Sequence, residues 1–206
     1  MNNSCPAVPS NAAVRPAGSL PAGKALPGDL AMWCLILVEM TVFALFFILF
    51  SWMHSHDPEL FLAGQQSLHP LAGLINTLAL LSSSALVARG VIANRRNQQR
   101  NAARSLFGAI LVALVYVSVK GWEYWQLGSA GYGLGGNNFF MGYFLLTGFH
   151  LLHVLLGMLI LAFMARKLQR GGYGPDAADG LETGACYWHM VDLLWIVLFP
   201  VVYIIH

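Results

Sequence analysis

The sequence predicts an all-α integral membrane bundle of five transmembrane helices. Hydrophobic residues make up 57% of the 206 residues and charged residues only 10%, whereas soluble domains are roughly 45–50% apolar and about 25% charged. The mean hydropathy is +0.62. Five apolar stretches have about the 20-residue length that crosses a bilayer as a helix. Because these runs are unbroken, they exclude the alternating strands of a membrane β-barrel.

The five predicted spans are separated by polar or Gly-rich connections. In chain order they are Leu30–Trp52, Leu71–Ala88, Ser105–Trp125, Phe139–Ala165 and Ala185–Ile205. The fourth span is the longest and is expected to tilt or to protrude from the bilayer. Residues 30–206 thus form one transmembrane domain. Residues 1–29 contain five prolines among Ala, Gly, Ser and Asn residues, a composition that predicts a flexible cytoplasmic tail.

The basic residues predict the orientation of the chain. Ten of the eleven Lys and Arg residues precede the first span or lie in the second and fourth loops: Arg15, Lys24, Arg89, Arg95, Arg96, Arg100, Arg104, Arg166, Lys167 and Arg170. By the positive-inside rule these segments are cytoplasmic. We therefore expect a multi-pass protein of a bacterial inner membrane, with a cytoplasmic N-terminus and a periplasmic C-terminus. The net charge of only +2 gives no support for a nucleic-acid partner.

Ionisable side chains inside the spans are the candidate functional residues, because burying them in a bilayer is costly. Glu39 lies in the first span, His150 and His153 in the fourth, and His189 and Asp192 in the fifth. At about 1.5 Å of rise per residue, His150 reaches the depth of Glu39. His153 reaches the depth of Asp192 in the same way. The sequence therefore predicts two pairs between helices, Glu39–His150 and His153–Asp192.

The roles of these groups stay open at this point. Glu39 has no Lys or Arg on another span at its depth, so we expect a largely neutral carboxyl group. Glu39 has either a proton-related or regulatory role, or a structural role as a neutral hydrogen-bonding group. A histidine inside a helix bundle is more often a packing residue than a ligand. Lys120 and Glu123, three residues apart near the outer end of the third span, predict an internal pair that snorkels toward the interface.

No motif predicts catalysis by this chain alone. The sequence has neither a Gly-x-Ser-x-Gly elbow nor a His-Glu-x-x-His pair. Haem needs axial ligands on facing helices and structural zinc needs four ligands, so we expect no metal and no cofactor. A haem between His150 or His153 and His189 is an alternative, as is a small transporter. No inverted repeat or interrupted helix supports the transporter.

Five motifs, one in each span, occur in the order known from one protein family. They are Trp33 with Glu39, Asn76-Thr77 with Ser82–Ser84, Glu123-Tyr124, the run from Thr147 to Gly157 that holds His150 and His153, and the run from Tyr187 to Trp195 that holds His189 and Asp192, followed by Tyr203. With these motifs the chain resembles subunit III of the haem-copper oxidases, in its short five-helix form. The resemblance covers roughly residues 30–205.

The resemblance implies a function without catalysis by the chain itself. Subunit III of this family is an all-helical bundle that binds neither haem nor metal and docks on the catalytic subunit I. It stabilises the enzyme during turnover and supports proton uptake, oxygen access and aerobic electron transport. The family's membrane-embedded, carbodiimide-reactive glutamate corresponds to Glu39. A cleft between the first helices and the remaining bundle holds phospholipids, and we expect Arg89 or Arg95 near their phosphate groups.

One related function stays an alternative. A branch of the family accompanies nitric oxide reductase in denitrification as an accessory membrane protein of similar size. Leu151 stands where oxidase subunits often have a glycine after the first histidine of the fourth-span motif. The two branches share the fold and differ in partner, which is subunit I of an oxidase in one case and the subunits of nitric oxide reductase in the other.

Overall fold

The computed structural model describes residues 30–133, 137–173 and 179–204. Within these ranges the chain forms six α-helices: α1 (Leu30–His56), α2 (Pro58–Gln66), α3 (Pro70–Arg95), α4 (Gln99–Ser129), α5 (Asn138–Gln169) and α6 (Asp179–Tyr203). Five of them are long and apolar enough to cross a membrane, which confirms the predicted all-helical bundle. The predicted tail, residues 1–29, and the predicted end of the last span at Ile205 lie outside the described residues.

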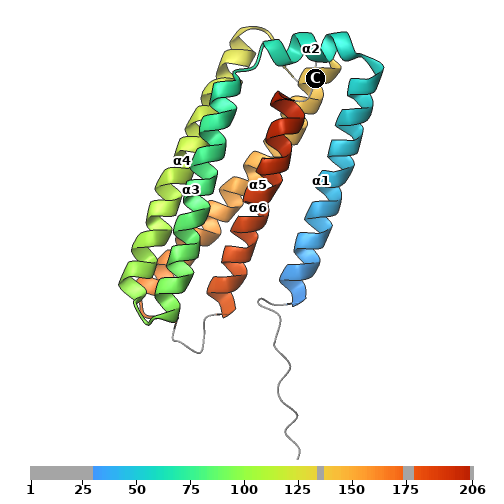
Figure 1. The fold of residues 1–206 in the computed structure, drawn as a ribbon. Coiled ribbons are helices and arrows are strands. Elements are labelled where there is room, and N and C mark those ends of the chain that lie inside the picture. The colour runs from blue at the N-terminus through green and yellow to red at the C-terminus, as the bar shows by residue number, and fades with distance from the viewer. Residues whose placement is uncertain (1–29, 134–136, 174–178, 205–206) are drawn as a thin grey trace, which may run out of the picture.

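Four helices form the body of the protein and a fifth is added to its side. Helices α3, α4, α5 and α6 pack in sequence, and α6 closes back on α3. Helix α1 lies outside this bundle against α5 and α6 (Figure 1). The most apolar stretch of α6 is 56% buried inside the protein, whereas that of α1 is only 11% buried. Most of α1 therefore faces the surroundings of the bundle.

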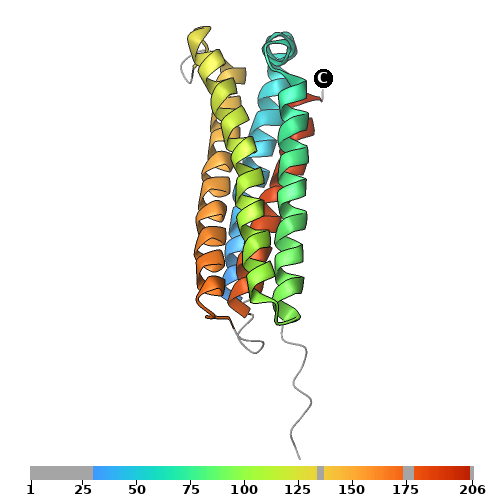
Figure 2. The same cartoon turned by 90° about the vertical axis from the view of Figure 1, so that its left-hand side faces the viewer.

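The short helix α2 is the element that the sequence analysis missed. It lies across one end of the long helices (Figure 1) and is seen nearly end-on when the molecule is turned by 90° (Figure 2). Pro58 is the first residue of α2, a position where the missing N–H of proline is tolerated. Phe61 is fully buried against the rings of Phe50 and Phe139. Gly64 lies so close to Phe139 that a Cβ atom would collide with the ring.

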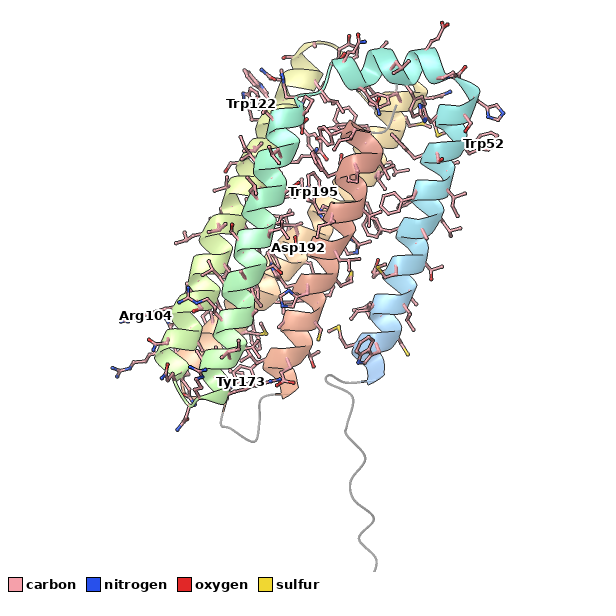
Figure 3. The ribbon with its side chains drawn as sticks, in the orientation of Figure 1. Trp52, Arg104, Trp122, Tyr173, Asp192 and Trp195 are labelled. Carbon is pink, nitrogen blue, oxygen red and sulfur yellow. The ribbon has the colours of Figure 1, made fainter. Side chains whose placement is uncertain are left out.

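The two ends of the bundle differ in composition. Arg104 and Tyr173 lie at one end, near the turn between α3 and α4 and the end of α5, while Trp52 and Trp122 lie at the other (Figure 3). The turn between α3 and α4 is tight, and Asn97 takes a left-handed conformation with φ of 58°. Because α3 and α5 both run toward this end, the arginines of the two predicted basic loops are brought together there. We call it the basic end.

Candidate functional site

An acid–imidazole pair joins α1 to the bundle. The Oε2 atom of Glu39 lies 3.0 Å from Nε2 of His153. The other ring nitrogen, Nδ1, lies 2.8 Å from the carbonyl oxygen of Phe149. Because a carbonyl oxygen only accepts, Nδ1 carries a hydrogen. The contact with Glu39 therefore holds one proton, either on the carboxyl group or on Nε2, and the pair is neutral overall in both forms.

The structure corrects both predicted pairings. Glu39 binds His153 rather than His150, and Asp192 forms a hydrogen bond with Ser84 on α3 rather than with His153. Depth alone places a side chain at a level but not in a direction around its helix. Residues three apart differ by about 60° around the axis, so His153 faces α1 while His150 faces the centre of the bundle.

We expect the Glu39–His153 contact to appear as an energetic coupling. In a double-mutant cycle, the unfolding free energy of the variant with both Glu39→Ala and His153→Ala is compared with that of each single variant. The double variant should lose about 1 kcal/mol less than the sum of the two single losses. The matched control pairs Glu39→Ala with His150→Ala, one turn away, and should be additive within about 0.5 kcal/mol. Unfolding in mixed detergent micelles measures both, and additivity of the first pair would contradict the contact.

A second polar cluster, the Lys120 cluster, joins α4, α5 and α6. The Nζ atom of Lys120 donates to Oε2 of Glu123 at 2.9 Å, to the hydroxyl of Tyr143 at 2.9 Å and to that of Tyr203 at 2.8 Å. The hydroxyl of Tyr203 in turn donates to Glu123. Lys120 is 0% exposed and Glu123 is 1% exposed. All three ammonium hydrogens thus have partners inside the protein.

The predicted internal pair of Lys120 and Glu123 is confirmed, but the predicted snorkelling is wrong. The ammonium group does not reach the interface because two tyrosine hydroxyls and the carboxylate satisfy it where it lies. Aromatic rings also surround it, with centroids 4.7 Å away for Tyr143 and 5.5 Å away for Trp195. Such contacts stabilise a desolvated cation. The two tyrosine contacts were not predicted, because Tyr143 and Tyr203 come from other helices.

A third polar cluster joins α3 to α6 near the middle of the bundle. The hydroxyl of Ser84 hydrogen-bonds Nδ1 of His189 and also the carboxyl group of Asp192. Nearby, the indole N–H of Trp195 donates to the hydroxyl of Thr77 at 2.9 Å. His189 and Asp192 are three residues apart and share a face of α6. Their common partner on α3 was not predicted.

His150 differs from the other two histidines. Its ring is fully buried, with the rings of Phe43, Tyr116 and Trp195 between 5.3 and 6.3 Å away. Neither ring nitrogen has a hydrogen-bond partner within the described part of the chain. The ring therefore acts as an aromatic packing group at the meeting point of α1, α4, α5 and α6.

The histidines do not converge on a common centre. His153 is bound to α1 and His189 to α3, while His150 is enclosed by aromatic rings. Among the residues that the structure describes, no three His, Cys, Asp or Glu side chains could hold one metal ion. The arrangement offers hydrogen bonding between helices.

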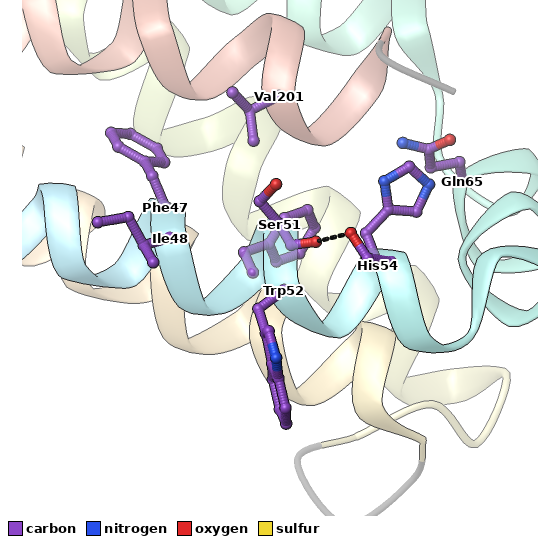
Figure 4. A pocket seen from close by; sticks show the side chains of 9 residues that line it. Phe47, Ile48, Ser51, Trp52, His54, Gln65 and Val201 are labelled. Atoms are coloured by element: carbon purple, nitrogen blue, oxygen red, sulfur yellow. Dashed lines mark hydrogen bonds between the residues drawn. The ribbon is translucent and has the colours of Figure 1, made fainter.

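A cavity of about 510 Å³ lies between α1, α2 and the end of α6 (Figure 4). Aromatic and aliphatic side chains form most of its wall, with polar groups at the end near α2. The lining residues are Phe47, Ile48, Phe50, Ser51, Trp52, His54, Ser55, Gln65 and Val201. This cavity lies between the first helix and the rest of the bundle, where the resemblance implies lipid binding.

The two arginines expected near lipid phosphates lie at the basic end of α3. Arg95 forms an ion pair with Glu182 of α6, with 2.8 Å between Nη2 and Oε1. Its charge is therefore partly neutralised within the protein. Arg89 is exposed on the surface of α3. Neither residue lines the cavity near α2, which is at the opposite end of the bundle.

Comparison with known proteins agrees with this architecture. The profile of the family described as "Cytochrome c oxidase subunit III" matches residues 26–206. "Cytochrome c oxidase subunit 3" of Synechocystis is 33% identical over 185 residues, which are 86% of this chain and 76% of that protein. The protein of the same name from Thermostichus vulcanus is 36% identical over 132 residues, 64% of each chain.

A fused relative also matches. "Heme-copper oxidase subunit I+III" of Aeropyrum pernix is 30% identical over 181 residues, 85% of this chain but only 22% of that protein. This chain therefore spans about a fifth of the fused protein and less than two thirds of the Thermostichus protein. The names of these relatives support the oxidase branch and lend no support to the nitric oxide reductase, haem-binding or transporter alternatives. The chain belongs to the cytochrome c oxidase subunit III family of the haem-copper oxidases.

Proposed function

We propose that this chain acts as the non-catalytic subunit III of a respiratory haem-copper oxidase, packed against subunit I and stabilising it during aerobic electron transport. The family match, which extends over all five long helices, carries this proposal. The relative from Aeropyrum pernix is named as subunits I and III in one chain, which supports direct contact between the two. The largely exposed apolar side of α1 suits contact with a membrane partner or with lipid.

The proposed location is a bacterial inner membrane, with the basic end on the cytoplasmic side. The gathering of arginines from the α3–α4 turn and from the end of α5 at one end supports this orientation. Helix α1 would then enter from the cytoplasm and α6 would end on the periplasmic side. Trp52 and Trp122, exposed at the other end (Figure 3), suit the outer interface.

In this proposal the intramembrane polar groups hold the helices together, and no haem or metal is bound by this chain. Glu39, His153, His189, Asp192 and Glu123 each contact a residue in the protein. The proton shared by Glu39 and His153 makes Glu39 the candidate for carbodiimide modification. Phospholipid would occupy the cavity between α1, α2 and α6, whose apolar wall and polar end fit an acyl chain and its headgroup.

Removing the chain from its complex tests the proposed role. We expect the oxidase purified without this chain to reduce oxygen at a similar initial rate but to lose activity after fewer turnovers. Adding the purified chain back should restore the number of turnovers. An unchanged number of turnovers would contradict a stabilising role. If removal of the chain abolished the reduction of nitric oxide and left the reduction of oxygen unchanged, the chain would be assigned to nitric oxide reductase.

A further inference from the structure

A second cavity, the arginine pocket, lies at the basic end between the start of α4 and the end of α5. Its volume is about 570 Å³. Arg100 and Arg104 reach it from α4, and Arg170 reaches it from the residue that follows α5. The side-chain amides of Gln99 and Gln169 add polar groups to the wall. No acidic residue is among the described residues that line this pocket.

Two other cations of the basic end have partners in the protein. Arg95 is paired with Glu182 at 2.8 Å, and the Nζ atom of Lys167 lies 4.3 Å from the ring centroid of Tyr173. Across the described part of the chain, no carboxylate forms an ion pair with a pocket arginine. Like charges one helical turn apart repel each other, so a bound anion would stabilise the pocket.

Several features of the pocket favour an anion. Arg100 and Arg104 lie one turn apart, with about 6 Å of rise between them. Guanidinium groups bind phosphate oxygens through two parallel hydrogen bonds. The pocket also includes the first turn of α4, and the positive end of a helix dipole favours negative charge. Its floor is closed by Ala103 and Leu168, which are 2% and 1% exposed.

The position of the pocket indicates a lipid rather than a soluble anion. The predicted apolar span of α4 begins at Ser105, directly after Arg104, so the pocket lies at the level of the headgroups. On the same side of α4, Leu111 is seven residues further into the span and 67% exposed. Phe163 is seven residues before Arg170 on α5 and is also 67% exposed. These apolar surfaces offer contact to acyl chains below the headgroup.

We propose that the arginine pocket binds the headgroup of an anionic phospholipid that carries two phosphate groups, as in cardiolipin. Three guanidinium groups, two on α4 and one directly after α5, exceed what a single phosphate can neutralise. Basic pockets between helices at the cytoplasmic level are suited to such headgroups. This site is separate from the cavity between α1, α2 and α6, which lies at the opposite end of the bundle and has no arginine in its wall.

Lipid titration of the full chain tests the proposal. The chain is purified in mild detergent, and binding of added cardiolipin is followed by native mass spectrometry. We expect Arg104→Gln/Arg170→Gln to weaken cardiolipin binding by about thirtyfold. The control Arg89→Gln/Arg96→Gln removes two charges from the same end outside the pocket and should change binding by less than about threefold. The wild-type chain should prefer cardiolipin to phosphatidylglycerol and phosphatidylcholine.

Three results would overturn the proposal. Equal losses in both double variants would mean that the overall charge of the basic end attracts the lipid, without a site. Unchanged binding in the pocket variant would place the lipid elsewhere. In the third result, inorganic pyrophosphate binds as tightly as cardiolipin and loses its binding in the same pocket variant. That result would identify a site for a soluble phosphate. Circular dichroism checks that both double variants keep the helical content of the wild type.

Discussion

Replacing Lys120 by methionine lowers the unfolding free energy by about 3–5 kcal/mol, because the carboxylate of Glu123 is left buried without its cation. The methionine keeps most of the volume of the lysine stem, so the loss reports on charge and hydrogen bonding. The hydroxyls of Tyr143 and Tyr203 also lose a donor. Unfolding of the purified chain in mixed detergent micelles, followed by circular dichroism, measures the loss.

Two further variants separate this effect from a general loss of charge. Adding Glu123→Gln to Lys120→Met removes the unpaired carboxylate and should recover a substantial part of the loss, because a neutral amide can still accept from Tyr203. Lys167→Met removes an exposed lysine at the basic end and should cost no more than about 1 kcal/mol, through the loss of its contact with the ring of Tyr173. A loss in Lys120→Met no larger than in Lys167→Met would contradict the Lys120 cluster.

Gly157→Ala is the second substitution with a large expected effect. A Cβ atom at Gly157 would lie 2.8 Å from Cε3 of Trp188. The indole ring is rigid and is 1% exposed, so it cannot move without shifting α6 away from α5. We expect a loss of about 1–3 kcal/mol in unfolding free energy, as for other overpacked cores.

Gly148→Ala on the same helix is the matched control. A Cβ atom there has its nearest neighbour, the hydroxyl of Tyr124, at 3.9 Å. The substitution should leave stability unchanged or raise it by up to about 1 kcal/mol through the better helix propensity of alanine. Equal stabilities of the two variants would contradict the close packing of α5 on α6.

The long helices could be predicted from the sequence, whereas the contacts between them could not. Unbroken apolar runs predict spans because a helix satisfies its own backbone in lipid. The first four predicted spans each lie within one observed helix, and the fifth coincides with α6 from Ala185 to Tyr203. Helix α2 was missed because its nine residues are too short and too polar to resemble a span. Local signals for a helix were present there, with Pro58 at the first position and Glu59 in the first turn.

For the polar residues too, positions along a helix could be predicted from the sequence, whereas partners on other helices could not. The residue types and approximate depths of Glu39, His153 and Asp192 were readable from the spans, but their partners depend on helix rotation and adjacency. The Lys120–Glu123 pair was predictable because both residues lie on one helix at a spacing of three. Tyr143 and Tyr203 reach it from α5 and α6, a contact that no local pattern indicates.

The central claim is that the chain belongs to a haem-copper oxidase complex, and affinity purification from native membranes in mild detergent tests it most directly. The account predicts that a haem protein with the optical spectrum of an oxidase elutes together with the chain, and that mass spectrometry identifies oxidase subunits I and II. Elution of nitric oxide reductase subunits, or of the chain without any haem protein, would contradict it.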